Sequence, residues 1–148
     1  HLTRALQARG RGDSGFRISN FIAWHVKEDE AASFAEARRE QMIRGWLEQP
    51  WLEPFLDEDE AALVTEKKGS FLKAFRERHG NIDDVPAPIT QKLVDGLSLA
   101  GGLDSVDRHV EHLRDFAAAG FTEIALRIHD DPEESIRLIG ERVLPALT

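Results

Sequence analysis

The sequence of 148 residues contains no cysteine. This absence excludes a disulfide framework, a cysteine nucleophile and a thiolate metal site, and we expect a cytoplasmic protein. No apolar run approaches the roughly 20 residues that span a bilayer. Basic residues are the minority, 19 against 27 acidic ones, so the formal net charge is −8. We therefore expect neither a nucleic acid nor an anionic membrane as partner, because both attract clustered Lys and Arg.

The start of the chain lacks an initiator methionine and the pattern of a signal peptide. Its first residues, His1 to Leu6, are typical of the middle of a helix. We therefore expect the chain to begin inside a longer natural sequence. A chain of this length is sufficient for one domain with one core.

The last fifty residues have the clearest pattern. Residues 97–100 predict a short buried strand, which runs through two glycines into a helix over 105–119. Residues 122–128 predict a second strand, followed by a helix that starts at Pro132 and ends at Pro145. A strand, a helix and a strand with short connections predict a parallel pair, so we expect 97–100 to pair directly with 122–128.

The first half of the chain adds one strand and a helical segment. Residues 16–26 are rich in Phe, Ile, Trp and Val, which predicts a strand at the start of a unit that ends with a long helix at residue 47. Residues 48–90 predict a variable helical insertion, and residues 91–148 predict two β/α units. Three parallel strands cannot cover both faces or close their edges, so we expect part of a larger α/β fold.

Three segments of the second half resemble a known family. They are AGGLDSVDRHV at 100–110, AGFTEIALR at 119–127 and DPEESIRL at 131–138. Together they resemble the C-terminal end of the luciferase-like monooxygenases, which include bacterial luciferase and the deazaflavin-dependent methylenetetrahydromethanopterin reductases. The resemblance implies an eight-stranded β/α barrel of the TIM type, of which this helix-rich chain is the C-terminal portion with about three strands.

The resemblance also implies a function. The parent protein would be an oxidoreductase that performs hydride transfer or monooxygenation on a small organic substrate, with FMN or a deazaflavin (coenzyme F420) as cofactor. The absent N-terminal part would bind most of that cofactor, so the fragment alone would be inactive. The alternative is a non-catalytic fragment that acts as an interaction module. Its open strand edges predict either a homo-oligomer or association with the missing part of its own barrel.

Candidate site residues follow from the rule that β/α barrels place their active sites at the C-terminal ends of the strands. The rule selects six residues as candidates for binding cofactor or substrate: Trp24, His25, Gly101, Gly102, Arg127 and His129. No catalytic residue and no metal ligand is assigned.

Each of these candidates has a structural alternative. Arg127 and His129 are suited to an anionic cofactor tail or an acidic substrate, but Arg127 can instead pair with a following aspartate, Asp130 or Asp131. Trp24 and His25 are neighbours on a strand, so at most one of them faces the barrel interior and the other packs in a core. The glycine pair at 101–102 precedes a helix, which suits an anion, but Asp104 competes for that position and a tight strand-to-helix turn explains the pair better.

Two further groups of residues remain open at this stage. His109 and His112 have a spacing that can hold a metal, yet no third ligand is evident and we expect them on a solvated helix face. Trp46, Trp51 and Phe55 lie among prolines in the insertion. They are equally consistent with an apolar lid over a substrate pocket and with a small separate core.

Overall fold

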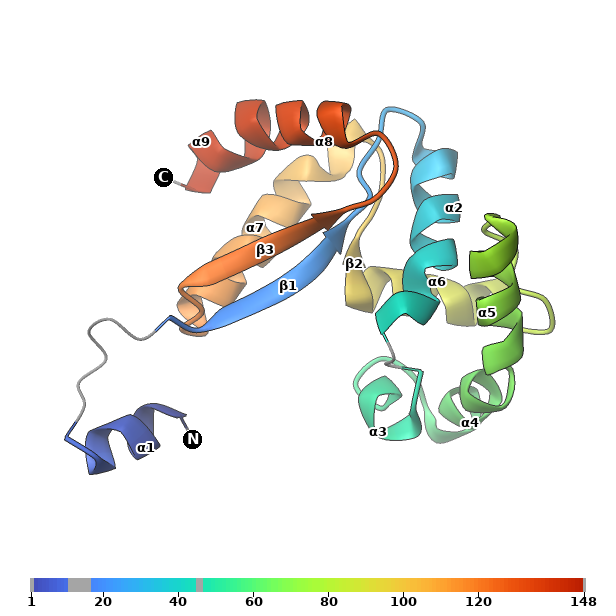
Figure 1. The fold of residues 1–148 in the computed structure, drawn as a ribbon, viewed down its shortest axis with the longest axis horizontal. Helices are drawn as coiled ribbons and strands as arrows, with labels where there is room; N and C mark the ends of the chain where they lie inside the picture. The colour runs from blue at the N-terminus through green and yellow to red at the C-terminus, as the bar shows by residue number, and fades with distance from the viewer. Residues whose placement is uncertain (1, 11–16, 45–46, 148) are drawn as a thin grey trace.

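The computed structural model describes residues 2–10, 17–44 and 47–147, and its central element is one parallel sheet (Figure 1). Its strands are β1 (Ser19–Trp24), β2 (Ser98–Leu99) and β3 (Glu123–Ile128), in the order β2-β1-β3. All pairings are parallel, which confirms the strand type and the approximate strand positions that the sequence predicts.

The order of the strands corrects one prediction. Residues 97–100 do not pair with 122–128, because β1 lies between them. Strand β3 pairs with β1 in an unbroken register from Ser19↔Glu123 to Trp24↔Ile128. Strand β2 pairs with β1 only at Ser98 and Leu99, because the helix before it continues to Leu97 and Gly101 turns the chain away. The connection after β2 therefore crosses β1 to reach its other edge.

Helices cover only one face of this sheet. They are η2 (Leu103–Ser105), α7 (Val106–Ala118), α8 (Pro132–Leu138), η3 (Ile139–Val143) and α9 (Leu144–Leu147), and Figure 1 shows α7 behind the strands. Strand residues pack against them in an apolar core of Ile22, Trp24, Leu99, Val106, Val110, Leu113, Leu138 and Val143. Among the described residues no helix covers the opposite face, where Phe21 is 41% exposed. This open face is what a piece of a barrel is expected to show.

The helices α2 to α6 form a second layer beside the sheet. They are α2 (Glu30–Arg39), η1 (Glu40–Arg44), α3 (Gln49–Leu52), α4 (Glu58–Glu66), α5 (Lys68–Glu77) and α6 (Ala87–Leu97). Helix α1 (Leu2–Ala8) is not part of this layer (Figure 1). Helices α3 to α6 have an apolar core of their own, which includes Leu52, Val64, Phe71, Ile89 and Leu93. Helix α2 begins at Glu30, because the Asp29 side chain caps it by accepting hydrogen bonds from Ala31 N and Ala32 N. None of the described helices has the length and apolarity that a membrane crossing needs.

The end of the chain differs from its prediction. The last helical segment does not stop at Pro145 but continues to Leu147. The five residues before Leu144 form a π-helix, in which Leu144 N bonds to Ile139 O. A wider turn of this kind rearranges the hydrogen bonds near the proline, which has no N–H to donate.

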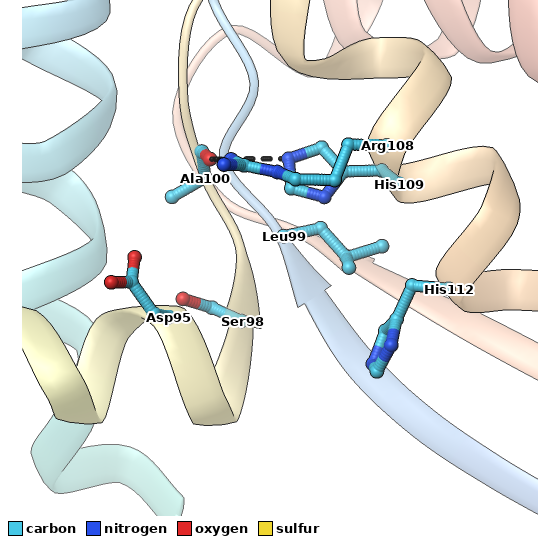
Figure 2. A pocket seen from close by; sticks show the side chains of 7 residues that line it. All are labelled: Asp95, Ser98, Leu99, Ala100, Arg108, His109 and His112. Carbon is cyan, nitrogen blue, oxygen red and sulfur yellow. Dashed lines mark hydrogen bonds between the residues drawn. The ribbon is translucent and has the colours of Figure 1, made fainter.

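His109 protects the outer edge of β2. It is buried, not solvated as the sequence suggests, and its Nε2 lies 3.1 Å from Ala100 O (Figure 2). A carbonyl oxygen only accepts, so Nε2 must donate this hydrogen bond. Burial lowers the pKa of His109 to about 4, so the ring is neutral at pH 7.

Gly80 allows a close approach between the loop after α5 and helix α2. A Cβ atom at Gly80 would lie 2.5 Å from the Cα and O atoms of Ala35. The obstacle is backbone, which cannot rotate out of the way as a side chain can. Gly69, in helix α5, has no atom within 4 Å of the corresponding position.

These two glycines predict opposite effects of the same substitution. Gly80→Ala forces α2 and the loop apart and should lower the free energy of unfolding by roughly 1–3 kcal/mol. Gly69→Ala reduces the backbone freedom of the unfolded chain and causes no clash in helix α5. It should therefore raise the free energy of unfolding by roughly 0.5–1 kcal/mol. Urea unfolding followed by circular dichroism measures both. Equal effects of the two substitutions would contradict the packing described here.

His109 predicts a dependence of stability on pH. Between pH 6.5 and about pH 4 the unfolded imidazole binds a proton that the folded one does not, so stability falls as the pH drops through this window. His109→Gln keeps an N–H donor for Ala100 O but does not titrate. Urea unfolding at pH 7.5 and pH 4.5 should show a loss of stability that is smaller by about 1–3 kcal/mol in the variant. An identical loss in both proteins would show that His109 does not cause it.

Candidate functional site

The carboxyl ends of β1 and β3 bring two histidines together. The register pairs Trp24 with Ile128, so the next residue on each strand, His25 and His129, lies at the same edge of the sheet. Their rings stack with centroids 5.1 Å apart and planes 21° from parallel. The parallel pairing of the two strands thus creates a site that neither strand has alone.

Two carboxylates of the helical layer hold these rings. Glu36 and Glu40 are four residues apart on α2 and η1, so they lie one above the other on one helical face. Glu36 Oε1 lies 2.7 Å from His25 Nδ1, and Glu40 Oε2 lies 3.2 Å from His129 Nδ1. Each imidazole is therefore oriented by its own buried carboxylate, as in carboxylate–histidine pairs of enzymes.

A cation completes each pair. Lys27 Nζ lies 3.0 Å from Glu36 Oε2, and Arg39 Nε donates to Glu40 Oε1 at 2.7 Å. Burial by itself raises the pKa of Glu40, but His129 and Arg39 outweigh it and lower the value to about 2. The pKa of Glu36 is lowered in the same way, with burial opposed by His25 and Lys27. Both carboxylates are therefore ionised at neutral pH.

An outer ring of charges ties the loop after β3 to this pair of helices. Asp130 bonds to Arg39 Nη2 at 2.9 Å and to Arg78 Nη2 at 2.8 Å, and Arg78 adopts a left-handed conformation (φ 59°) at the end of α5. Lys27 Nζ reaches Asp130 O at 3.2 Å and Asp131 Oδ2 at 3.3 Å. Asp131 therefore stands at the N-cap of α8 without capping it, since its side chain binds Lys27 instead. A cavity of about 280 Å³ lies next to this network.

Two carboxylate oxygens and one guanidinium nitrogen of this cluster, Glu36 Oε2, Glu40 Oε2 and Arg39 Nη2, are buried without a well-aligned hydrogen bond. Glu36 Oε2 and Glu40 Oε2 are buried and have Lys27 and His129 within 3.2 Å, but the angles fall outside those of a hydrogen bond. Lys27 nevertheless balances the charge of Glu36, because Coulomb attraction depends on distance and not on hydrogen-bond angle. The angles still leave lone pairs on both oxygens that can accept an additional N–H or O–H donor.

The structure divides the predicted site residues into two groups. His25 and His129 meet in the cluster, and the side chain of His129 is the more exposed at 10% against 1%. Trp24 points the other way and packs in the apolar core, with its ring against His109. Of the two neighbours on β1, the histidine therefore faces the site and the tryptophan faces the helices.

The other three predicted residues lie outside the cluster. Gly101 has a left-handed φ of 141°, its N–H donates to Ser33 Oγ at 2.8 Å and its carbonyl accepts from Lys27 N, so it fixes the turn after β2. Gly102 follows in the same buried turn. Arg127 pairs in register with Ala23 and thus lies on the face opposite Trp24. No ion pair joins it to Asp130 or Asp131 in the described part of the chain.

Sequence reasoning missed the charged partners of the two histidines. Lys27, Glu36, Arg39 and Glu40 were assigned to a long helix without a role. The i, i+4 spacing of the two glutamates was available as a signal, but a solvated helix shows the same spacing. Only the tertiary structure, which places α2 beside the sheet, distinguishes glutamates that contact the two histidines from glutamates on a solvated helix face.

A second polar cavity of about 280 Å³ lies along the outer edge of β2 (Figure 2). Asp95 and Ser98 line it from α6 and β2, and Arg108 and His112 from α7. His112 points into this space and does not share a ligand position with His109, which points to Ala100. Among residues 2–10, 17–44 and 47–147 no group of three or more His, Asp or Glu is placed to hold a metal.

The tryptophans of the insertion support neither a lid nor a core as a group. Trp46 lies outside the described residues. Trp51 is 64% exposed, whereas Phe55 packs against the helical core and against Gly96. Phe55 thus belongs to the small separate core that the sequence left as one alternative.

Comparison with known proteins finds a match in structure. No family model matches the sequence, and no curated protein matches it. The chain is similar in structure to the coenzyme F420-dependent tetrahydromethanopterin reductase from Methanopyrus kandleri, with a TM-score of 0.69 and 19% sequence identity. The match covers 99% of this chain and 40% of that chain, so this chain spans two fifths of the length of the reductase.

This reductase is a protein of the kind that the sequence resemblance names, a member of the luciferase-like family. At this level of identity the likeness establishes the fold. The chain therefore has the fold of part of a TIM-type barrel, as the family resemblance implies.

Proposed function

We propose that this chain is the C-terminal part of a cytoplasmic luciferase-like oxidoreductase that transfers hydride between a deazaflavin cofactor and a small organic substrate. One observation carries the proposal. A buried cluster of two imidazoles and two carboxylates lies at the carboxyl ends of parallel strands, where β/α barrels hold their active sites. The structural likeness to an F420-dependent reductase favours the deazaflavin over FMN, and hydride transfer over oxygen insertion.

The residues of the histidine cluster do not fit the anionic part of such a cofactor. Each cation of the cluster, Lys27, Arg39 and Arg78, already contacts a carboxylate. Four carboxylates face these three cations, so the cluster offers no surplus positive charge to a phosphate. We therefore infer that the rest of the barrel holds most of the cofactor, and we derive no chemical step through it.

The proposal assigns this chain the wall of the substrate pocket. His129 is the more exposed of the stacked rings, and Glu40 fixes its orientation, so it is suited to contact a polar group of the substrate. Arg127 lies on the open face of the sheet, where it is suited to an acidic substrate. Trp24, Gly101 and Gly102 support this wall from behind, through the core and the turn after β2.

A second function, self-association, is favoured by the open sheet face. Phe21 is 41% exposed there, Ala125 beside it is exposed, and β3 has one edge without a partner strand among the described residues. An uncovered parallel sheet favours pairing with further strands. These strands would come from the missing part of the barrel or from a second copy of this chain.

A cofactor titration tests the proposed function. The natural protein that carries this chain should bind F420 with a dissociation constant of roughly micromolar order and FMN more weakly, as followed by absorbance and by fluorescence. Residues 1–148 alone should bind neither, because the cations of the histidine cluster are already paired with carboxylates and the rest of the barrel would hold the cofactor. Light scattering on the same samples measures self-association.

The outcomes separate the two functions. Tight binding of FMN alone would redirect the proposal to a flavin enzyme of the same fold, and no binding of either cofactor would refute the oxidoreductase. Tight binding by residues 1–148 would refute the inference that the rest of the barrel holds the cofactor. If residues 1–148 self-associate in light scattering and the natural protein binds neither cofactor, the result would support the interaction module.

A further inference from the structure

A third polar cavity lies on the far side of α2 from the histidine cluster. Its volume is about 360 Å³, and it is enclosed by α2, the loop over residues 80–86 and the first turn of α6. The polar and backbone groups that line it come from Arg38, Gly80, Asn81, Ala87, Thr90 and Gln91. None of the lining residues is acidic, although the chain has a net charge of −8.

Arg38 is held at this cavity by the backbone. Its Nε donates to Gly80 O at 2.8 Å, and Gly80 in turn lies directly against Ala35 on the same helix. This bond uses one of the five N–H groups of the guanidinium and fixes the plane of the others. No ion pair joins Arg38 to a carboxylate in the described ranges of the chain. Its neighbour Arg39, in contrast, contacts both Glu40 and Asp130.

The loop keeps its own acidic groups away from Arg38. Asp83 pairs with Lys73 Nζ at 2.7 Å, and neither Asp83 nor Asp84 lines the cavity. Burial lowers the pKa of Arg38, and no carboxylate opposes this shift. A partly buried cation without a counterion costs free energy, which an anion bound in the cavity would recover.

Of the other polar side chains at the cavity, only that of Asn81 makes no hydrogen bond to another described residue. Gln91 is occupied with Asp95, and the Thr90 hydroxyl donates to Ala87 O, so both side chains are held in place. Asn81 has an amide that can donate, and its backbone N–H is bound to His79 Nδ1. The cavity also borders the first turn of an eleven-residue helix, α6, whose dipole adds a partial positive charge.

We propose that Arg38 and Asn81 bind the oxyanion group, a phosphate or a carboxylate, of a small metabolite in this cavity. The planar fork of a guanidinium matches two oxygens of either group. The site is separate from the histidine cluster and does not depend on the proposed oxidoreductase function. Because Glu36 lies on α2 and Glu40 begins η1 directly after it, an occupied cavity would steady the helical segment that orients both imidazoles.

Calorimetry and hydrogen exchange on the natural protein test this site. Inorganic phosphate and acetate serve as separate probes, and hydrogen–deuterium exchange reports which peptides they protect. We expect protection over residues 80–91 and a dissociation constant that rises by roughly tenfold in Arg38→Gln. Arg76→Gln is the matched control, because this exposed arginine lies on α5 and does not line the cavity.

A second variant covers the case in which Arg38→Gln does not fold. Asn81→Asp leaves the bond from Arg38 to Gly80 O intact but places a carboxylate in the cavity, so it should also abolish anion binding. Protection by phosphate only assigns the site to phosphate compounds, and protection by acetate only assigns it to carboxylates. No protection over residues 80–91, equal weakening by Arg38→Gln and Arg76→Gln, or full binding by Asn81→Asp would overturn the proposal.

Discussion

The in-register parallel pairing of β1 with β3 is the constraint on which the rest of the structure depends. It places His25 beside His129, directs Trp24 into the helical core, and leaves Phe21 and Arg127 on the open face. A shift of one residue would move every one of these side chains to the other face of the sheet. The site therefore depends on backbone hydrogen bonds between two segments that lie about a hundred residues apart in the sequence.

The charged cluster stabilises the fold only as a complete unit. Glu36 and Glu40 are almost fully buried, and each is compensated by one imidazole and one cation. Removal of one partner from a buried pair typically costs about 3–5 kcal/mol, because an uncompensated charge remains behind. Because the cations of the cluster are paired in this way, they offer no surplus positive charge to an anion. Arg38, one residue before Arg39, differs, because it has no carboxylate at ion-pair distance among the described residues.

Local patterns predicted the elements well where one pattern dominated. The apolar spacing of 106–118 and the alternation of 123–128 gave a helix and a strand close to those observed. Prediction was wrong where a contact with a distant segment decides. His109 is buried because its ring donates to Ala100 O beside β2, and 97–100 does not pair with 122–128 because β1 lies between them. The helix through Pro145 likewise depends on a π-turn, which no local pattern shows.

The sequence by itself determined the elements and the parallel character of the sheet, because these follow from short-range spacing and from capping residues. It also placed His25 and His129 at strand ends. The kind of barrel was implied only by the resemblance to a known family. The tertiary structure alone decided the order β2-β1-β3, the selection of Glu36 and Glu40 as partners, and the separation of Arg38 from Arg39. The physical reason is that strand order and charge pairing depend on distances between segments, and a linear pattern does not contain those distances.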